Sequence, residues 1–187
     1  MRTMGTRRRT WRTWGAAGYT IVELAMGMAI SGIVAGVSMP NILGSIHRYR
    51  ADAAPRQVMG DLRFAQSQAV ARGMEARLVI FDTAGQATGA GYADATRANL
   101  YRVELRPTGG AWPALADTMA TNGNVLSEWL DLAADYRQSV TQANAVVFTS
   151  RASLQNSAAS LNIVLQSVPG GAARTVRSHP SGQVEIL

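Results

Sequence analysis

The feature that most constrains this chain is an apolar segment near its N-terminus, residues 24–46, which contains no Asp, Glu, Lys, Arg or His. As an α-helix it would be roughly 35 Å long, enough to cross the ~30 Å hydrocarbon core of a bilayer. A single carboxylate, that of Glu23, immediately precedes it. Because a charge at the membrane is costly, an acid in this place indicates a functional role. The sequence therefore predicts an exported, anchored protein.

The chain's charge belongs mostly to the part before this segment. A formal net charge of +6 over 187 residues would favour a nucleic-acid-binding protein. However, no acidic residue precedes Gly18, while five arginines do: Arg2, Arg7, Arg8, Arg9 and Arg12. The other 169 residues carry 13 Arg against 12 acids, a net charge of +1. The positive-inside rule places the N-terminus in the cytoplasm and the part of the chain after the apolar helix on the other side of the membrane.

Three parts are predicted along the chain: a leader (1–18), a transmembrane and assembly helix (19–46) and a globular domain (47–187). The helix is expected to continue to about residue 73, where Gly73 is a typical C-cap. Apolar residues at helical spacing indicate this extension, namely Val58, Leu62, Ala65 and Ala69. Pro40 and Pro55 each remove a backbone donor, which predicts a bend or local loosening.

Beyond residue 73 the pattern changes to short, β-branched or alternating runs separated by clusters of Gly, Asn, Ser and Pro. Such runs predict strands at 76–82, 100–106, 145–149, 161–168, 174–178 and 183–187. Residues 84–98 are expected to form a loop, and 107–143 a longer stretch with a short helix or strand around 129–136. The expected fold is α+β, with a long N-terminal helix packed on a mostly antiparallel sheet domain.

The junction of leader and helix, Gly18-Tyr19-Thr20-Ile21-Val22-Glu23, resembles the type IV prepilin signature. Gly32 and Pro40 also fall where pilin helices carry their Gly and Pro. The resemblance implies a pilin-like fold and cleavage by prepilin peptidase between Gly18 and Tyr19, with methylation of the new N-terminus. It also implies that Glu23 pairs with the N-terminal amine of a neighbouring subunit. The alternative is a plain signal anchor with an incidental Glu.

Gly32 and Gly36 form a GxxxG motif within the apolar helix. In a helix bundle this spacing lets backbones approach closely. The equally acceptable interpretation is that Gly is simply common in this segment.

Three further stretches, 62–73, 146–151 and 174–184, resemble the GspH/FimT pseudopilins. This implies a minor pseudopilin in the type II secretion pseudopilus or at a type IV pilus tip. Its domain would be periplasmic and its helix in the inner membrane. The expected partners are the prepilin peptidase, other pseudopilins or minor pilins, and exported protein cargo.

The alternative within the same family is a FimT-like minor pilin that binds DNA for uptake. By the same resemblance, DNA-binding members of the FimT branch carry a Gly-Arg-x-Arg motif near the C-terminus. This chain has Gly182-Gln183-Val184-Glu185 in that place, without the two arginines. Arg174 and Arg177 are the remaining candidates for weak, salt-sensitive phosphate contacts. We expect that DNA is not a partner.

An enzymatic or cofactor-dependent role is not expected. There is no Cys, only two His (His47 and His179), and no nucleophile elbow, zinc-protease or P-loop motif. We expect no metal and no cofactor. His179 could join Ser178 or Ser181 only by coincidence. Trp112, Trp129 and Tyr136 are interpreted as core residues rather than as a binding surface.

Overall fold

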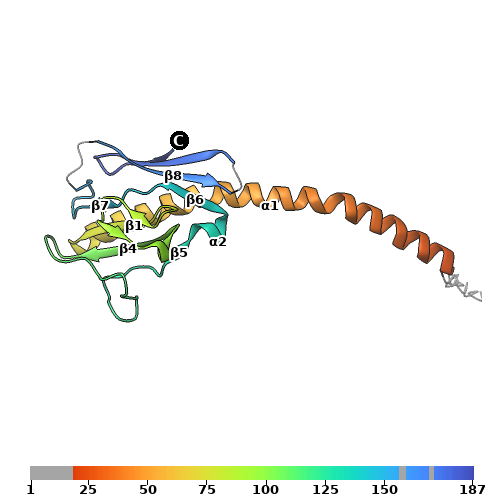
Figure 1. The fold of residues 1–187 in the computed structure, drawn as a ribbon, viewed down its shortest axis with the longest axis horizontal. Coiled ribbons are helices and arrows are strands. Elements are labelled where there is room, and N and C mark those ends of the chain that lie inside the picture. The colour runs from red at the N-terminus through yellow and green to blue at the C-terminus, as the bar shows by residue number, and fades with distance from the viewer. Residues whose placement is uncertain (1–18, 156–158, 169–170) are drawn as a thin grey trace, which may run out of the picture. The chain divides into compact units, whose positions relative to one another are not determined.

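A computed structural model describes residues 19–155, 159–168 and 171–187 (Figure 1). The chain divides into two compact units, Met1–Leu43 and Gly44–Leu187. Helix α1 (Ile21–Arg72) is continuous through Pro40 and Pro55 and contributes to both units. The predicted leader, with Gly18, lies outside the described residues.

The predicted C-cap of α1 is confirmed. Gly73 has a φ of +62°, the left-handed conformation that glycine adopts without steric cost. Its N–H donates to the Val70 carbonyl at 3.3 Å, and the next N–H, of Met74, donates to the Ala69 carbonyl at 3.0 Å. The chain thereby leaves the helix and enters the first strand within two residues.

Two four-stranded sheets make up most of the domain, and all of their strand pairs are antiparallel. The first has the order β5-β4-β1-β7. Its strands are β1 (Glu75–Ile80), β4 (Leu100–Arg106), β5 (Leu130–Asp131) and β7 (Val146–Phe148). The second has the order β10-β9-β8-β6. Its strands are β6 (Gln138–Gln142), β8 (Leu161–Ser167), β9 (Ala173–Ser178) and β10 (Val184–Ile186). The predicted α+β class and mostly antiparallel pairing are confirmed.

Each of the six predicted strands is present, with the bounds of β4 as predicted and those of the other five shifted by at most two residues. The prediction of a plain loop at 84–98 is wrong, because it contains the two-stranded ladder β2 (Gln86–Ala87) and β3 (Tyr92–Ala93) and the 3₁₀ helix η1 (Ala95–Arg97). Glycines with positive φ at 85, 89 and 91 allow this tight folding. The expected short element near 129–136 is β5 followed by α2 (Leu132–Tyr136). Strand β6 was not predicted, because its sequence is mostly polar.

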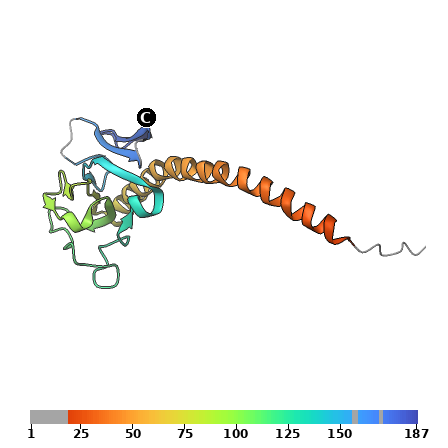
Figure 2. The ribbon, with the colours of Figure 1, turned by 45° about the vertical axis from the view of Figure 1, so that its right-hand side comes forward.

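The core lies where the C-terminal part of α1 meets both sheets. In Figure 1, β8 lies above this part of α1 and β4 and β5 lie below it, and Figure 2 shows the same arrangement from another side. The helix contributes a fully buried stripe, Ala54, Val58, Leu62, Ala65 and Ala69. The inward side chains of β1, β4, β8 and β9 that pack into the same core include Leu78, Val103, Leu165 and Val176.

A polar pair also joins α1 to the first sheet. The Tyr101 hydroxyl donates to Asp61 Oδ2 at 2.6 Å. Burial, reinforced by the hydrogen bond to this carboxylate, raises the pKa of Tyr101 well above its usual value. The phenol therefore stays protonated at neutral pH and remains a donor to Asp61.

Gln66 ties α1 to two turns that are distant in the sequence. Its Nε2 donates to the Ala152 carbonyl at 2.8 Å and to the Gly182 carbonyl at 3.1 Å. Gly182 has a φ of +87°, and a Cβ there would overlap both the Ala152 carbonyl and the Gln66 amide. Position 182 therefore requires glycine for its backbone conformation and for the close approach of these groups.

Replacing Gln66 by Ala should lower the free energy of unfolding by about 1–3 kcal/mol, because two carbonyl groups lose their side-chain donor. The matched control is Gln68→Ala, which removes only a local contact with Arg72 on the same helix. Urea unfolding of the full chain in detergent provides the measurement. Equal midpoints for the two variants would contradict the role assigned to Gln66.

Candidate functional site

The first turn of α1 is closed by a reciprocal pair of hydrogen bonds between Thr20 and Glu23. The Glu23 N–H donates to Thr20 Oγ1 at 3.2 Å, and the Thr20 N–H donates to Glu23 Oε2 at 3.1 Å. The Thr20 hydroxyl also contacts the same carboxylate oxygen at 3.2 Å. This is a capping box, in which Thr and Glu three residues apart satisfy free N–H groups of a helix start. Glu23 thus has a local partner that sequence reasoning missed, although the Thr-x-x-Glu spacing could have revealed it.

The apolar part of α1 is not covered by any of the residues that the structure describes. The large apolar side chains that the structure describes between residues 21 and 46 are all exposed. One described helix, α1, is long and apolar enough to cross a membrane. An added Cβ at Gly32 or Gly36 would meet no atom within 4 Å. The chain's own packing therefore does not require glycine at these two positions.

A cluster of buried charges covers the outer face of β1 and β4. Arg77 Nε donates to Glu104 Oε2 at 2.7 Å, and Arg102 Nε donates to Glu104 Oε1 at 2.6 Å. All three side chains are almost fully buried. Arg77 and Glu104 are direct partners in the strand register, as are Glu75 and Arg106, whose side chains pair at 2.6 Å. The cross-strand charges therefore favour one register of the two strands.

Aromatic rings cover the guanidinium groups of this cluster. Trp112 lies over Arg77 and Arg106, with ring centroids 4.2 and 4.3 Å from the guanidinium carbons. Trp129 lies over Arg102 at 4.3 Å and also packs against the buried Phe81. These are cation–π contacts at partly desolvated sites. Trp129 and Tyr136 pack against hydrophobic clusters of the domain, in agreement with their interpretation as core residues.

Arg102 also fixes the long segment between β4 and β5. Its Nη1 donates to the Asp117 carbonyl and its Nη2 to the Ala114 carbonyl, both at 2.7 Å. The Asp117 carboxylate accepts hydrogen bonds from the Asn122 side chain and the Ala114 N–H. These bonds hold the pKa of Asp117 below its usual value, and the bond from Asn122 has the largest effect. The segment is therefore held against the sheet by charged groups underneath it.

The two arginines considered for nucleic-acid contact do not form one site. Arg174 and Arg177 are three residues apart on β9, so their side chains leave opposite faces of the strand. Arg174 pairs with Asp52 at 3.4 Å, and Arg177 lies 3.6 Å from Glu185. Arg177 Nε also donates to Asn162 Oδ1 at 3.3 Å. Each arginine therefore has an acidic neighbour that weakens its attraction for phosphate.

His179 has different partners from the ones considered in the sequence. Its Nδ1 lies 3.2 Å from Ser160 Oγ, and its Nε2 lies 2.9 Å from Glu185 Oε1. Neither Ser178 nor Ser181 has a hydrogen bond to the ring among the contacts described. The His179 and Glu185 side chains are each about one-third exposed and lie on β10 and the turn that precedes it. We interpret this chain of contacts as a fastening of the β9–β10 turn to β8.

Among the described residues, no group of three or more His, Cys, Asp or Glu is placed to hold a metal ion.

Comparison with known families adds the decisive observation. The family model described as "Type II transport protein GspH" matches residues 54–182, which is most of the chain. The chain belongs to the GspH family. The matched region includes the buried stripe of α1, every strand of the two sheets except β10, and the covering segment between β4 and β5.

Solved structures also resemble this GspH-family chain. Two crystal structures of the type IV minor pilin FimU of Pseudomonas aeruginosa match with TM-scores of 0.46 and 0.47 and sequence identities of 11% and 10%. The matches cover 73% and 75% of this chain and 91% and 90% of FimU. Comparison with curated proteins gives no match.

Glu104→Gln should destabilise the domain by about 3–5 kcal/mol, since it leaves two buried guanidinium groups without their shared counter-charge. Glu128→Gln, at an exposed position, is the matched control and should change stability by less than about 0.5 kcal/mol. Denaturant unfolding followed by tryptophan fluorescence measures both. A Glu104→Gln variant as stable as the wild type would refute a structural role for the buried charges.

Proposed function

We propose that this GspH-family chain is a minor pseudopilin that is anchored in the inner membrane by α1. Its precursor is cut by prepilin peptidase, and the mature chain joins sister subunits in a type II secretion pseudopilus or at a type IV pilus tip. The domain faces the periplasm, where it contacts other pseudopilins and exported protein cargo. Its role in this assembly is not enzymatic.

The exposed apolar surface of α1 carries this proposal. An apolar surface of this length is unfavourable in water, so lipid or neighbouring helices must cover it. In a pseudopilin, lipid would cover this surface before assembly, and the helices of neighbouring subunits would cover it afterwards. Gly32 and Gly36 would then let neighbouring helices approach closely, and Pro40 would remove one backbone donor within the bundle.

We propose that processing occurs between Gly18 and Tyr19. In cells that express a prepilin peptidase, the mature chain should begin with an N-methylated Tyr19, as measured by intact and peptide mass spectrometry. Gly18→Val should keep residues 1–18, because a branched side chain prevents close approach of the peptidase to the backbone. A mature N-terminus at any other residue would rule out this assignment.

Glu23 has two separable roles under this proposal. One is the capping box with Thr20, which needs an acceptor side chain and is served by Gln as well as by Glu. The other is pairing with the N-terminal amine of a neighbouring subunit, which needs the negative charge. An unpaired charge within the bilayer costs at least about 2.5–3.5 kcal/mol, so the pairing would favour assembly at a fixed stagger.

Recovery of Glu23 variants in assembled filaments tests the charge pairing. Glu23→Gln and Glu23→Ala should both be processed normally and both be recovered at least tenfold less than the wild type, because each removes the charge. Thr20→Val keeps the charge, disrupts the capping box and should be recovered close to the wild-type level. If Glu23→Gln assembles normally while Glu23→Ala does not, capping rather than charge pairing is what assembly requires.

A further inference from the structure

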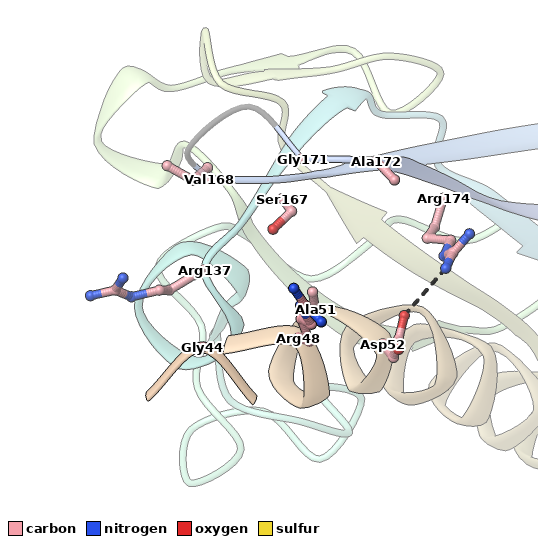
Figure 3. A pocket seen from close by; sticks show the side chains of 10 residues that line it. All are labelled: Gly44, Arg48, Ala51, Asp52, Arg137, Ser167, Val168, Gly171, Ala172 and Arg174. Atoms are coloured by element: carbon pink, nitrogen blue, oxygen red, sulfur yellow. Dashed lines mark hydrogen bonds and ion pairs between the residues drawn. The ribbon is translucent and has the colours of Figure 1, made fainter. Parts of the chain in front are cut away.

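A basic hollow lies beside the first domain residues of α1. It has a volume of about 510 Å³ and lies between α1 and the ends of β8 and β9. Figure 3 shows Arg48 and Asp52 on the side of the helix that faces Ser167 and Arg174, while the Arg137 side chain extends away from them. A neighbouring cavity extends it along α1, where Asp52, Arg56 and Arg174 contribute to its lining.

The charges around the hollow do not balance. Arg48, Asp52 and Arg56 are four residues apart, so they share one face of α1. Arg174 approaches the same carboxylate from β9, with its Nη2 3.4 Å from Asp52 Oδ1. One carboxylate thus stands among three guanidinium groups. The cluster keeps a surplus of two positive charges facing open space, which favours an anion.

The position of the hollow along the helix indicates which anion it meets. Arg48 follows the end of the apolar segment by two residues and Asp52 by six, or about 3 and 9 Å along the helix axis. The headgroup layer on each side of a bilayer is about 5–7 Å thick. Tyr49, between them, is 78% exposed, and tyrosine is enriched at this level of membranes. Arg48 therefore lies at headgroup depth. Asp52 and the Arg174 guanidinium beside it lie just outside this layer, and Arg56 lies farther out.

We propose that this hollow binds the phosphate of an anionic phospholipid in the leaflet nearest the domain, with Arg48 and Arg174 as the phosphate-binding residues. Asp52 holds Arg174 in place and limits the affinity. This inference rests on the proposed membrane anchoring. A lipid bound here would fix the domain at the membrane surface before assembly and would be released when the subunit leaves the bilayer.

The test is native mass spectrometry of the full chain in detergent, titrated with phosphatidylglycerol and with the zwitterionic phosphatidylcholine. The wild type should retain phosphatidylglycerol preferentially. The double variant Arg48→Gln/Arg174→Gln should lose up to about 30-fold in phosphatidylglycerol affinity, given about fivefold for each basic residue at an anionic surface. The control Arg63→Gln/Arg151→Gln removes the same charge at exposed positions outside the hollow and should match the wild type.

Asp52→Asn is the second variant, and it should raise phosphatidylglycerol retention because it removes the acid from the cluster. Apolar surface exposed by misfolding would retain both lipids, whereas this variant should raise the retention of phosphatidylglycerol alone. Equal retention by the hollow and control variants would overturn the proposal. It would also be overturned if inorganic phosphate alone bound as tightly as the lipid, or if the two arginines governed binding of duplex DNA and not of lipid.

Two further readouts distinguish failure of this inference from failure of the proposed function. Carbonate extraction reports whether the chain is anchored, and the intact mass reports whether it is cut before Tyr19. A chain that is anchored and cut but shows no lipid preference would overturn the lipid site alone. A chain released by carbonate would overturn the anchoring on which both proposals rest.

Discussion

The contact of one helix with two sheets is the constraint on which the rest of this domain depends. The buried stripe of α1 that includes Val58 and Leu62 is the surface against which the inward faces of both sheets pack. The sheets are built from strands of three to seven residues and one two-residue edge strand, β5, and small sheets of this kind need packing against a helix for stability. Gln66 adds the polar counterpart, because it binds turns that follow β7 and β9 from a position on the same helix.

The helices and strands could be predicted from the sequence where the pattern of apolar residues was periodic. The helical spacing of Val58 and Leu62 and the six β-branched runs gave the correct elements, and the family resemblance was correct. Strand order and β6 could not be predicted, since β6 is polar and derives its place from pairing with β8. The buried charges were also missed. Arg102 and Glu104 alternate with apolar residues, the pattern of a solvated strand face. Distant residues, including Trp112, Trp129 and the segment that Arg102 binds, make that face an interior.

Polar and charged side chains act at two places along α1, its N-terminus and its middle. At the N-terminal end, Thr20 and Glu23 satisfy backbone donors where an apolar helix begins. At the level of Arg48 and Asp52, the helix changes from an uncovered apolar surface to a charged one and then to a surface covered by the chain's own sheets. Of the candidate site, the apolar segment and Glu23 could be predicted, because they are local features of the sequence. The basic hollow combines residues from positions 48 to 174 and requires the fold.

The way Arg102 holds the segment between β4 and β5 has a consequence for sequence divergence. Its guanidinium group binds the main-chain carbonyls of Ala114 and Asp117, which every amino acid provides. The outward side chains of this segment are therefore free to drift, while its path over the sheet is maintained by Arg102 and the two tryptophans. A segment held in this way can present different side chains to its surroundings on an unchanged framework.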